Sequence, residues 1–210
     1  MSVVTIRGQL GGGATEIGKL VARSIGAEYV DREIIASVAE KVNREGKEIA
    51  AKEMPPGSFL GRLVDAIAGA AARGAGYQTI YLDTYEMPLE DRPYINALTD
   101  VIKNLAEMPS IVIRGRGSQF ILKDHPASLH VLVVAPLDLR VKRVAQGLNG
   151  DEQAAKRDIE KFDGSRREFI RHYFHAELED PINYDLVVNT ERFTNEASVS
   201  IIVEALRSRQ

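Results

Sequence analysis

The sequence contains no cysteine among its 210 residues. It therefore cannot form a disulfide framework or a thiolate metal site, and this composition agrees with a reducing cytoplasm. An excess of basic residues is also missing, since 27 Lys and Arg stand against 30 Asp and Glu, a formal net charge of −3. This balance disfavours a nucleic-acid partner, because such partners select basic surfaces.

Long apolar runs are absent as well, and no stretch approaches the about 18 apolar residues of a membrane-spanning helix. The opening MSVVTIRGQL lacks the basic region and apolar segment of a signal peptide. We therefore expect a soluble, cytoplasmic protein without a membrane partner, and leave its oligomeric state open. With 44% hydrophobic residues, the chain can bury one sizeable core, which predicts a single domain over residues 1–210.

Short apolar runs rich in β-branched residues predict buried strands at 3–6, 111–113, 129–134 and 186–188, and a shorter run predicts a fifth at 28–30. Apolar residues at helical spacing follow the first strand and the last one. Strands that alternate with helices favour an α/β fold with a doubly wound, mostly parallel five-stranded sheet.

Residues 32–106 interrupt this alternation, because they show helical patterns around the breaker MPPG at 54–57 and no clear strand. We interpret them as a helical insertion, with an irregular loop at 74–93 that we expect to be mobile. Residues 149–175 are densely charged and helical in composition, and offer few residues to a core.

The most informative stretch is GQLGGGAT at 8–15, directly after the first strand. A glycine-rich turn that leads from a strand into a helix presents backbone N–H groups and the positive end of the helix dipole to an anion. The pattern G-x-x-x-x-G-K-[ST] would fit if Ala14 were lysine, and Thr15 occupies the position of its Mg²⁺ ligand. A phosphate-binding loop, another phosphate or dinucleotide site, and an unliganded turn all remain open on the loop alone.

Further residues carry a family resemblance. VTIRGQLGGGATEIGKLVARSIGAEYVDREII resembles the opening of the cytidylate-kinase-like family of P-loop kinases, which reads strand, R-Q-L-G-S-G-G-x-E-I, helix, then Y-x-D-R-E. IVIRGRGSQFIL, LHVLVVAPLDLRVKRV, DGSRREFIRHYF and DPINYDLVVNTERF resemble the later blocks of the family, in the same order. That family often lacks the loop lysine, so Ala14 does not set this chain apart, whereas Thr15 stands where many members carry a basic residue.

The resemblance implies a P-loop kinase fold with an acceptor-binding insertion over 32–106 and a lid over about 149–175. It implies ATP-dependent phosphoryl transfer to a nucleoside monophosphate, with cytidylate as acceptor and ATP and Mg²⁺ as cofactors. ATP would bind over Gly8, Gly11, Gly12, Gly13, Ala14 and Thr15. Two alternatives stay open: a nucleotide-binding regulator without efficient transfer, and a kinase for another small acceptor.

Several charged side chains are candidates to complete the site. Arg166 and Arg167, in the D-x-x-R region that begins at Asp163, could replace part of the missing lysine charge by binding phosphate oxygens. Arg116 matches the acceptor-phosphate arginine of the family. Asp31 could hold Mg²⁺ through water or orient the acceptor, with Thr15 as the other metal candidate, or it could simply cap the next helix.

Other side chains give weaker signals. Arg140 and Arg143 lie where related kinases cover adenine, although a solvated helix face explains them equally well. His172 and His175 share the spacing of a helix face but lack a third metal ligand in the sequence, so we expect no zinc site.

Overall fold

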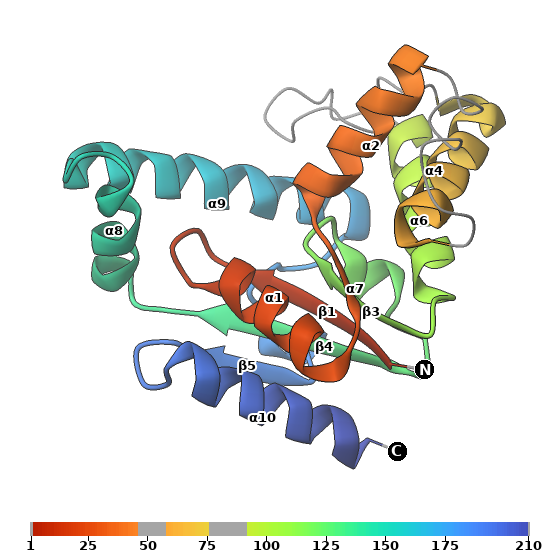
Figure 1. Cartoon of the computed structure of the whole chain (residues 1–210). Helices are drawn as coiled ribbons and strands as arrows, with labels where there is room; N and C mark the ends of the chain where they lie inside the picture. The colour runs from red at the N-terminus through yellow and green to blue at the C-terminus, as the bar shows by residue number, and fades with distance from the viewer. Residues whose placement is uncertain (1, 46–57, 76–91, 210) are drawn as a thin grey trace.

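The computed structural model describes residues 2–45, 58–75 and 92–209. Its centre is a single parallel sheet with the strand order β2-β3-β1-β4-β5 (Figure 1). The strands are β1 (Ser2–Gly8), β2 (Glu28–Val30), β3 (Ser110–Arg114), β4 (Ser128–Val134) and β5 (Leu186–Asn189). All five predicted strands are confirmed, and every pairing between them is parallel.

Strand β1 is the central strand, and its register defines the functional edge of the sheet. Ile6 pairs with Arg114 at the end of β3, and Gly8 pairs with Val133 near the end of β4. The carboxyl ends of these three strands therefore meet at one edge, where open α/β sheets bind their ligands.

One face of the sheet is covered by α1 (Ala14–Ile25) and α10 (Asn195–Ser208) (Figure 1). Ile17 and Val21 of α1 and Ile202 of α10 pack with Val4 and Ile6 of β1 in one buried cluster. The predicted helices after the first and last strands are thus confirmed, and their apolar stripes face the sheet.

The opposite face carries the larger core. It packs against α2 (Arg32–Glu45), α4 (Phe59–Ala70), α6 (Arg92–Ala106) and the short α7 (Ser118–Ile121), and a π-helical turn (Ala71–Ala75) continues α4. Ile35, Leu63 and Leu98 join Val3 and Ile111 of the sheet in one cluster. The described parts of the predicted insertion are therefore helical and share the sheet's core. Most of the expected 74–93 loop and the MPPG breaker lie outside the described residues.

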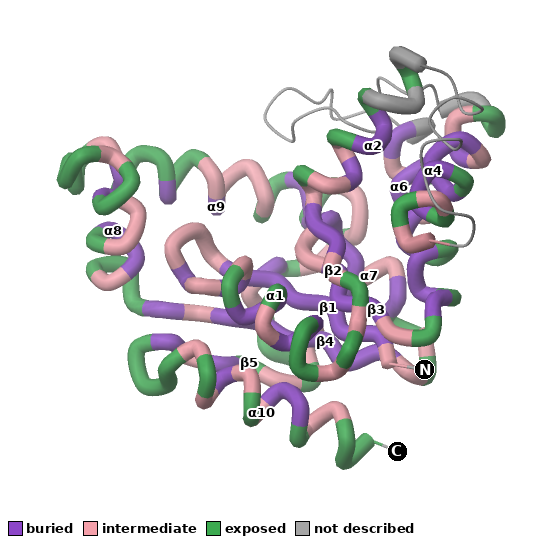
Figure 2. Tube along the Cα trace, viewed as in Figure 1, coloured by how far each residue is buried: buried purple, intermediate pink, exposed green. Residues whose placement is uncertain are grey.

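Two helices that pack on each other follow β4, namely α8 (Leu137–Gln146) and α9 (Glu152–Phe174), and a 3₁₀ turn (Pro181–Asn183) leads on to β5. The first half of α9 is mostly exposed, whereas its C-terminal half runs into the buried region (Figure 2). Phe169 and Ile170 belong to the larger core, so the expectation that 149–175 adds little to a core is wrong for this half. Within the described ranges, no helix is long and apolar enough to cross a membrane.

Candidate active site

The glycine loop between β1 and α1 has a backbone that only glycine fits at several positions. Gly11 and Gly13 have φ of 78° and 90°, in the left-handed region that L side chains rarely adopt. A Cβ on Gly8 would lie 2.2 Å from the Cβ of Ala14. The tight turn therefore brings the first helical residue directly against the end of β1.

The carbonyl groups of this loop are held from outside. Arg140 Nη1 donates to Leu10 O at 3.2 Å, and Thr190 Oγ1 donates to Gly12 O at 2.9 Å. Because the N–H of the next residue points opposite to the C=O in a trans peptide, those N–H groups face away from Arg140 and Thr190. The loop is thus fixed with amides available on its inner side, as anion binding requires.

Arg143 reinforces this arrangement, donating to Gly11 O at 3.3 Å and to Thr190 Oγ1 and O at 2.9 and 3.0 Å. Arg140 is buried, with 7% exposure, so the interpretation of Arg140 and Arg143 as a solvated helix face is wrong for Arg140. Both arginines contact the loop backbone, and the suggested contact with adenine stays a prediction.

Asp163 of α9 connects the predicted lid to the loop. Its Oδ2 accepts from Arg140 Nη1 at 2.7 Å, and its Oδ1 accepts from Leu10 N at 3.2 Å. The carboxylate is 3% exposed. This buried pair joins α8, α9 and the loop, a role that the sequence did not predict for Asp163.

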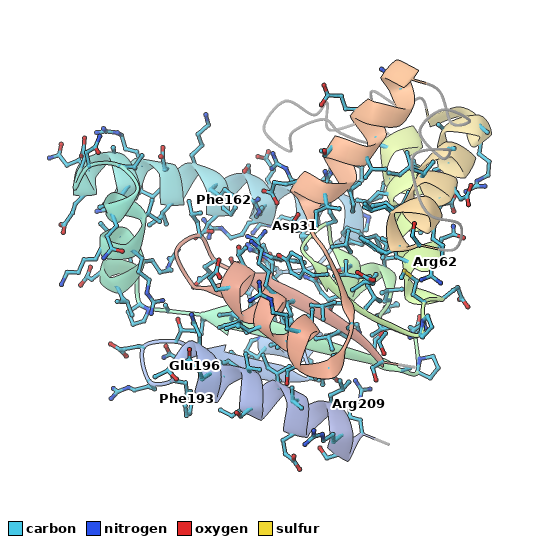
Figure 3. All side chains as sticks on the ribbon, viewed as in Figure 1. Asp31, Arg62, Phe162, Phe193, Glu196 and Arg209 are labelled. Atoms are coloured by element: carbon cyan, nitrogen blue, oxygen red, sulfur yellow. The ribbon has the colours of Figure 1, made fainter. Side chains whose placement is uncertain are left out.

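Beside the loop lies a cavity of about 280 Å³. Gly8 and Leu10 border it on the loop side, and the end of β3, the start of α2 and the second half of α9 form its other walls. Figure 3 labels Asp31 and Phe162, which mark the α2 and α9 sides. Among the described residues that line the cavity, one is acidic, Glu33, and five are arginines: Arg7, Arg32, Arg114, Arg116 and Arg166. Such a lining selects an anionic ligand.

Arg116 lies in a strained turn at the end of β3. Gly115, Arg116 and Gly117 all have positive φ, of 77°, 60° and 66°. Its Nη1 donates to the hydroxyl of buried Tyr94, while Nε and Nη2 are buried without a hydrogen-bond partner among the described residues. With 8% exposure and two unsatisfied donors in the cavity wall, Arg116 is placed to bind an anion.

Arg7, near the end of β1, was not predicted from the sequence. It is 7% exposed, its Nη1 donates to Gly8 O, and its Nη2 has no partner among the described residues. Burial lowers the pKa of the Arg7 guanidinium, and nearby Tyr184 and Asp163 oppose that shift. The available signal was a charged residue that ends an apolar strand immediately before the glycine loop.

Asp31 caps α2, as one of its two sequence interpretations predicts. Its Oδ1 accepts from Ile34 N and its Oδ2 accepts from the Tyr29 hydroxyl, each at 3.1 Å. Burial raises the pKa of that Tyr29 hydroxyl, so it remains a donor. The side chain of Asp31 is outside the cavity lining, and its suggested role with Mg²⁺ stays a prediction.

The two lid arginines differ in position. Arg166 lines the cavity, with its guanidinium carbon 3.0 Å from the centre of the Phe162 ring. Arg167 is outside the lining, 44% exposed, and its Nη1 lies 3.8 Å from Glu179 Oε1. The loop positions 11–13 and the first two residues of α1, Ala14 and half-buried Thr15, are not part of the described cavity lining.

No group of three or more His, Asp or Glu side chains within the described ranges could hold a metal ion. Mg²⁺ in kinases is commonly held by one or two protein groups together with substrate phosphates. Thr15 and Asp31 stay the predicted protein ligands for that limited role, although both Asp31 oxygens already accept hydrogen bonds.

Comparison with known proteins decides the family. A sequence model described as the cytidylate kinase-like family matches residues 3–192. The chain belongs to this family. It is 26% identical to a cytidylate kinase of Methanosarcina barkeri over 98% of this chain and 96% of that protein. A cytidylate kinase of Methanopyrus kandleri is 28% identical over 60% of this chain and 69% of its own length.

Two solved structures superpose on this chain over nearly its whole length. An uncharacterised protein from Eubacterium ventriosum superposes with a TM-score of 0.69 at 17% identity, covering 99% of both chains. A shikimate kinase from Bacteroides thetaiotaomicron superposes with a TM-score of 0.51 at 15% identity, covering 98% of both chains. The predicted P-loop kinase fold is therefore confirmed, and family membership supports a nucleotide or small-molecule kinase.

Proposed function

We propose that this chain transfers the γ-phosphoryl group of ATP to a nucleoside monophosphate, with cytidylate as the acceptor. One observation carries the proposal: Arg116 keeps two buried, unpartnered donors in a cavity that reaches the glycine loop. A phosphate dianion would satisfy both donors in a charge-assisted way. The cytidylate kinases among the relatives support cytidylate as the choice of acceptor.

ATP would lie on the loop over 8–15. The backbone N–H groups of Gly11 and of Gly13 to Thr15, at the start of α1, would hold its phosphates, whereas the N–H of Gly12 donates to Gln9 O. Mg²⁺, bound to those phosphates with help from Thr15 and Asp31, would neutralise charge on the transferred group. The side chains of the chain itself mainly position the two substrates and compensate their charge.

The acceptor would occupy the arginine-lined cavity. Arg116 would bind its phosphate, and Arg166 would approach the same region from α9. Arg167 would need movement of α9 to reach the cavity, because its guanidinium is exposed beside Glu179. The start of α2, with Arg32 and Glu33, would form the wall on the side of the insertion.

A second function is favoured by one specific observation. Ala14 is 4% exposed and packs against Gly8, so the position of the usual loop lysine carries no charge. Thr15 also lacks the basic group that many family members carry. A protein with this loop could bind nucleotide and regulate a partner without efficient transfer.

A coupled assay separates the two functions. The purified chain, ATP, Mg²⁺ and each of a panel of nucleoside monophosphates would be tested for ADP release. We expect turnover to be fastest with cytidylate. Tight nucleotide binding without turnover on any acceptor would contradict the kinase and favour the regulator, whereas faster turnover with another acceptor would correct the substrate alone.

Replacement of Arg116 tests the acceptor site directly. Arg116→Ala removes charge-assisted hydrogen bonds of about 1.5–3 kcal/mol, so cytidylate affinity should fall about ten- to a hundredfold. Isothermal titration calorimetry measures this loss, and ATP affinity should change little. Arg207→Ala, at an exposed position of α10, is the matched control and should bind cytidylate as the parent does. Unchanged cytidylate affinity in Arg116→Ala would exclude this acceptor site.

A further inference from the structure

We infer that Arg7 contacts the phosphoryl group during transfer and supplies the positive charge that the loop lacks at position 14. This inference rests on the proposed function, since it requires ATP on the glycine loop and an acceptor near Arg116. It adds a catalytic residue that neither the loop motif nor the lid provides.

The position of Arg7 supports the assignment. Arg7 directly precedes Gly8, and its strand β1 lies beside β3, whose end carries Arg116. The cavity runs from Gly8 and Leu10 to the Arg114–Gly117 turn, and Arg7 lines it too. Arg7 therefore lines the same cavity as the proposed ATP loop and the proposed acceptor turn.

The burial of Arg7 favours a further anionic partner. A guanidinium remains protonated in proteins, and burying a cation with a donor left unpaired is unfavourable. Nη2 of Arg7 has no hydrogen-bond partner among the described residues. Two carboxylates oppose the lowering of the Arg7 pKa, Asp163 and Glu179, but Asp163 already accepts from Arg140 and Leu10, and neither makes a hydrogen bond with Nη2.

Arg140, Arg143 and Arg116 have other tasks, since the first two bind the loop backbone and the spare donors of Arg116 are assigned to the acceptor. Arg140 and Arg143 bind loop carbonyl groups from the α8 side. Arg116 donates to Tyr94 at the acceptor end of the cavity. Ala14 cannot contribute, so among the described residues Arg7 is the buried arginine that directly precedes the loop and keeps a spare donor.

The transfer step needs no nucleophile from the protein, because the acceptor phosphate itself attacks. An oxygen of the acceptor phosphate forms a bond to the γ-phosphorus, while the bond from that phosphorus to its bridging oxygen breaks and its electron pair stays on ADP. Negative charge spreads over the three equatorial oxygens of the transferred group. Arg7 would neutralise that charge, a task that elsewhere falls to the loop lysine.

Arg7→Gln tests the assignment by kinetics and by binding. We expect kcat to fall about a hundredfold or more, as when one preorganised transition-state donor is removed, with cytidylate KM within about twofold. Affinity should fall more for ATP than for ADP, and not for AMP, because Arg7 is inferred to contact the terminal phosphate. Arg7→Lys should retain part of the rate, and Arg207→Gln, which is exposed, should behave as the parent.

A positive charge placed at position 14 of the Arg7→Gln variant provides the sharpest test. Ala14→Lys in the Arg7→Gln background should restore kcat at least about tenfold, which a purely structural role of Arg7 would not allow. Should Ala14→Lys fail to fold beside Gly8, the ATP, ADP and AMP series alone decides. Equal loss for all three nucleotides, or weakened cytidylate binding with unchanged ATP binding, would overturn the inference. Absence of turnover in the parent would instead overturn the proposed function, and the binding series would still test Arg7.

Discussion

At the residue scale, unusual backbone geometry is concentrated around the cavity. Of the nine described residues with positive φ, five belong to two turns: Gly11 and Gly13 in the loop, and Gly115, Arg116 and Gly117 after β3. Arg116 is the informative one, because a non-glycine residue there costs free energy that the surrounding structure must offset. Strain of this kind accumulates at functional sites more than elsewhere.

Gly13→Val should abolish ATP binding. The φ of 90° strains a β-branched residue, although a Cβ alone would meet nothing closer than 3.7 Å, so the effect comes from the backbone. A reshaped turn would misdirect the amides that face the phosphates. Binding of a fluorescent ATP analogue measures the loss. Gly26→Val, at a left-handed residue at the end of α1, is the control for strain alone. ATP affinity retained in Gly13→Val would contradict the loop assignment.

His130 predicts a pH dependence of stability. Burial lowers the pKa of His130, whose Nδ1 lies 2.7 Å from Thr5 Oγ1. A histidine whose pKa is lower in the folded protein than in the unfolded chain binds fewer protons in the folded state. The free energy of unfolding should therefore fall as the pH drops from about 7 through the unfolded pKa near 6.5.

Urea denaturation at several pH values measures that loss. His130→Gln should flatten the slope between pH 7 and 5, because glutamine does not titrate. The comparison matters because burial raises the pKa of Glu179, which adds stability at low pH in both proteins. An identical slope in the parent and in His130→Gln would contradict the prediction.

At the element scale, α8 and α9 brace the glycine loop. Three hydrogen bonds to the loop come from Arg140, Arg143 and Asp163, and the apolar residues Ala155 and Ile159 of α9 pack on α8. The N-terminal half of α9 is therefore connected to the loop by a buried ion pair as well as by apolar contacts. Movement of α9 as a lid would have to break that pair.

Asp163→Ala should lower the free energy of unfolding by about 3–5 kcal/mol, since it leaves Arg140 buried without its carboxylate. Urea denaturation measures the change, and Asp158→Ala on the exposed side of α9 is the control. Adding Arg140→Met to Asp163→Ala should recover part of the loss, because the unpaired charge is removed. A double variant no more stable than Asp163→Ala would show that the pair does not account for the loss.

Helices and strands could be predicted where the pattern that indicates them lies within one short segment of the sequence. The strand 129–134 and the helix after the glycine loop follow directly from apolar pattern, and the caps follow from single residues such as Asp31. The Arg140–Asp163 pair joins positions 23 apart, and no periodic pattern indicates it. The same holds for the contact of Arg116 with Tyr94, because it depends on how α6 packs against the end of β3.

At the scale of the whole molecule, the cavity combines distant parts of the chain. Its walls come from the ends of β1 and β3, the start of α2 and the second half of α9. Ligands that bind there hold these segments together and cannot bind the unfolded chain in the same way. Ligand binding should therefore stabilise the whole fold.

Thermal unfolding with ATP, cytidylate or both measures this linkage. A ligand at a hundred times its dissociation constant adds about 2.7 kcal/mol, or roughly 5–11 °C in Tm for a domain of this size. We expect each nucleotide to raise Tm, and the pair to raise it further. Arg116→Ala should lose the shift with cytidylate and keep the shift with ATP, and loss of both shifts would contradict separate sites.

The division of the cavity wall has a consequence for how relatives could diverge. Arg7 and Arg114 are carried by strands locked into the sheet and Arg116 by the turn after β3, whereas Arg32 and Glu33 are contributed by α2. Remodelling the helices between β2 and β3 would alter the surface offered to a base or sugar and leave the strand-borne arginines unchanged. Relatives with this fold could in this way accept different substrates while they keep the same arginines for binding phosphate.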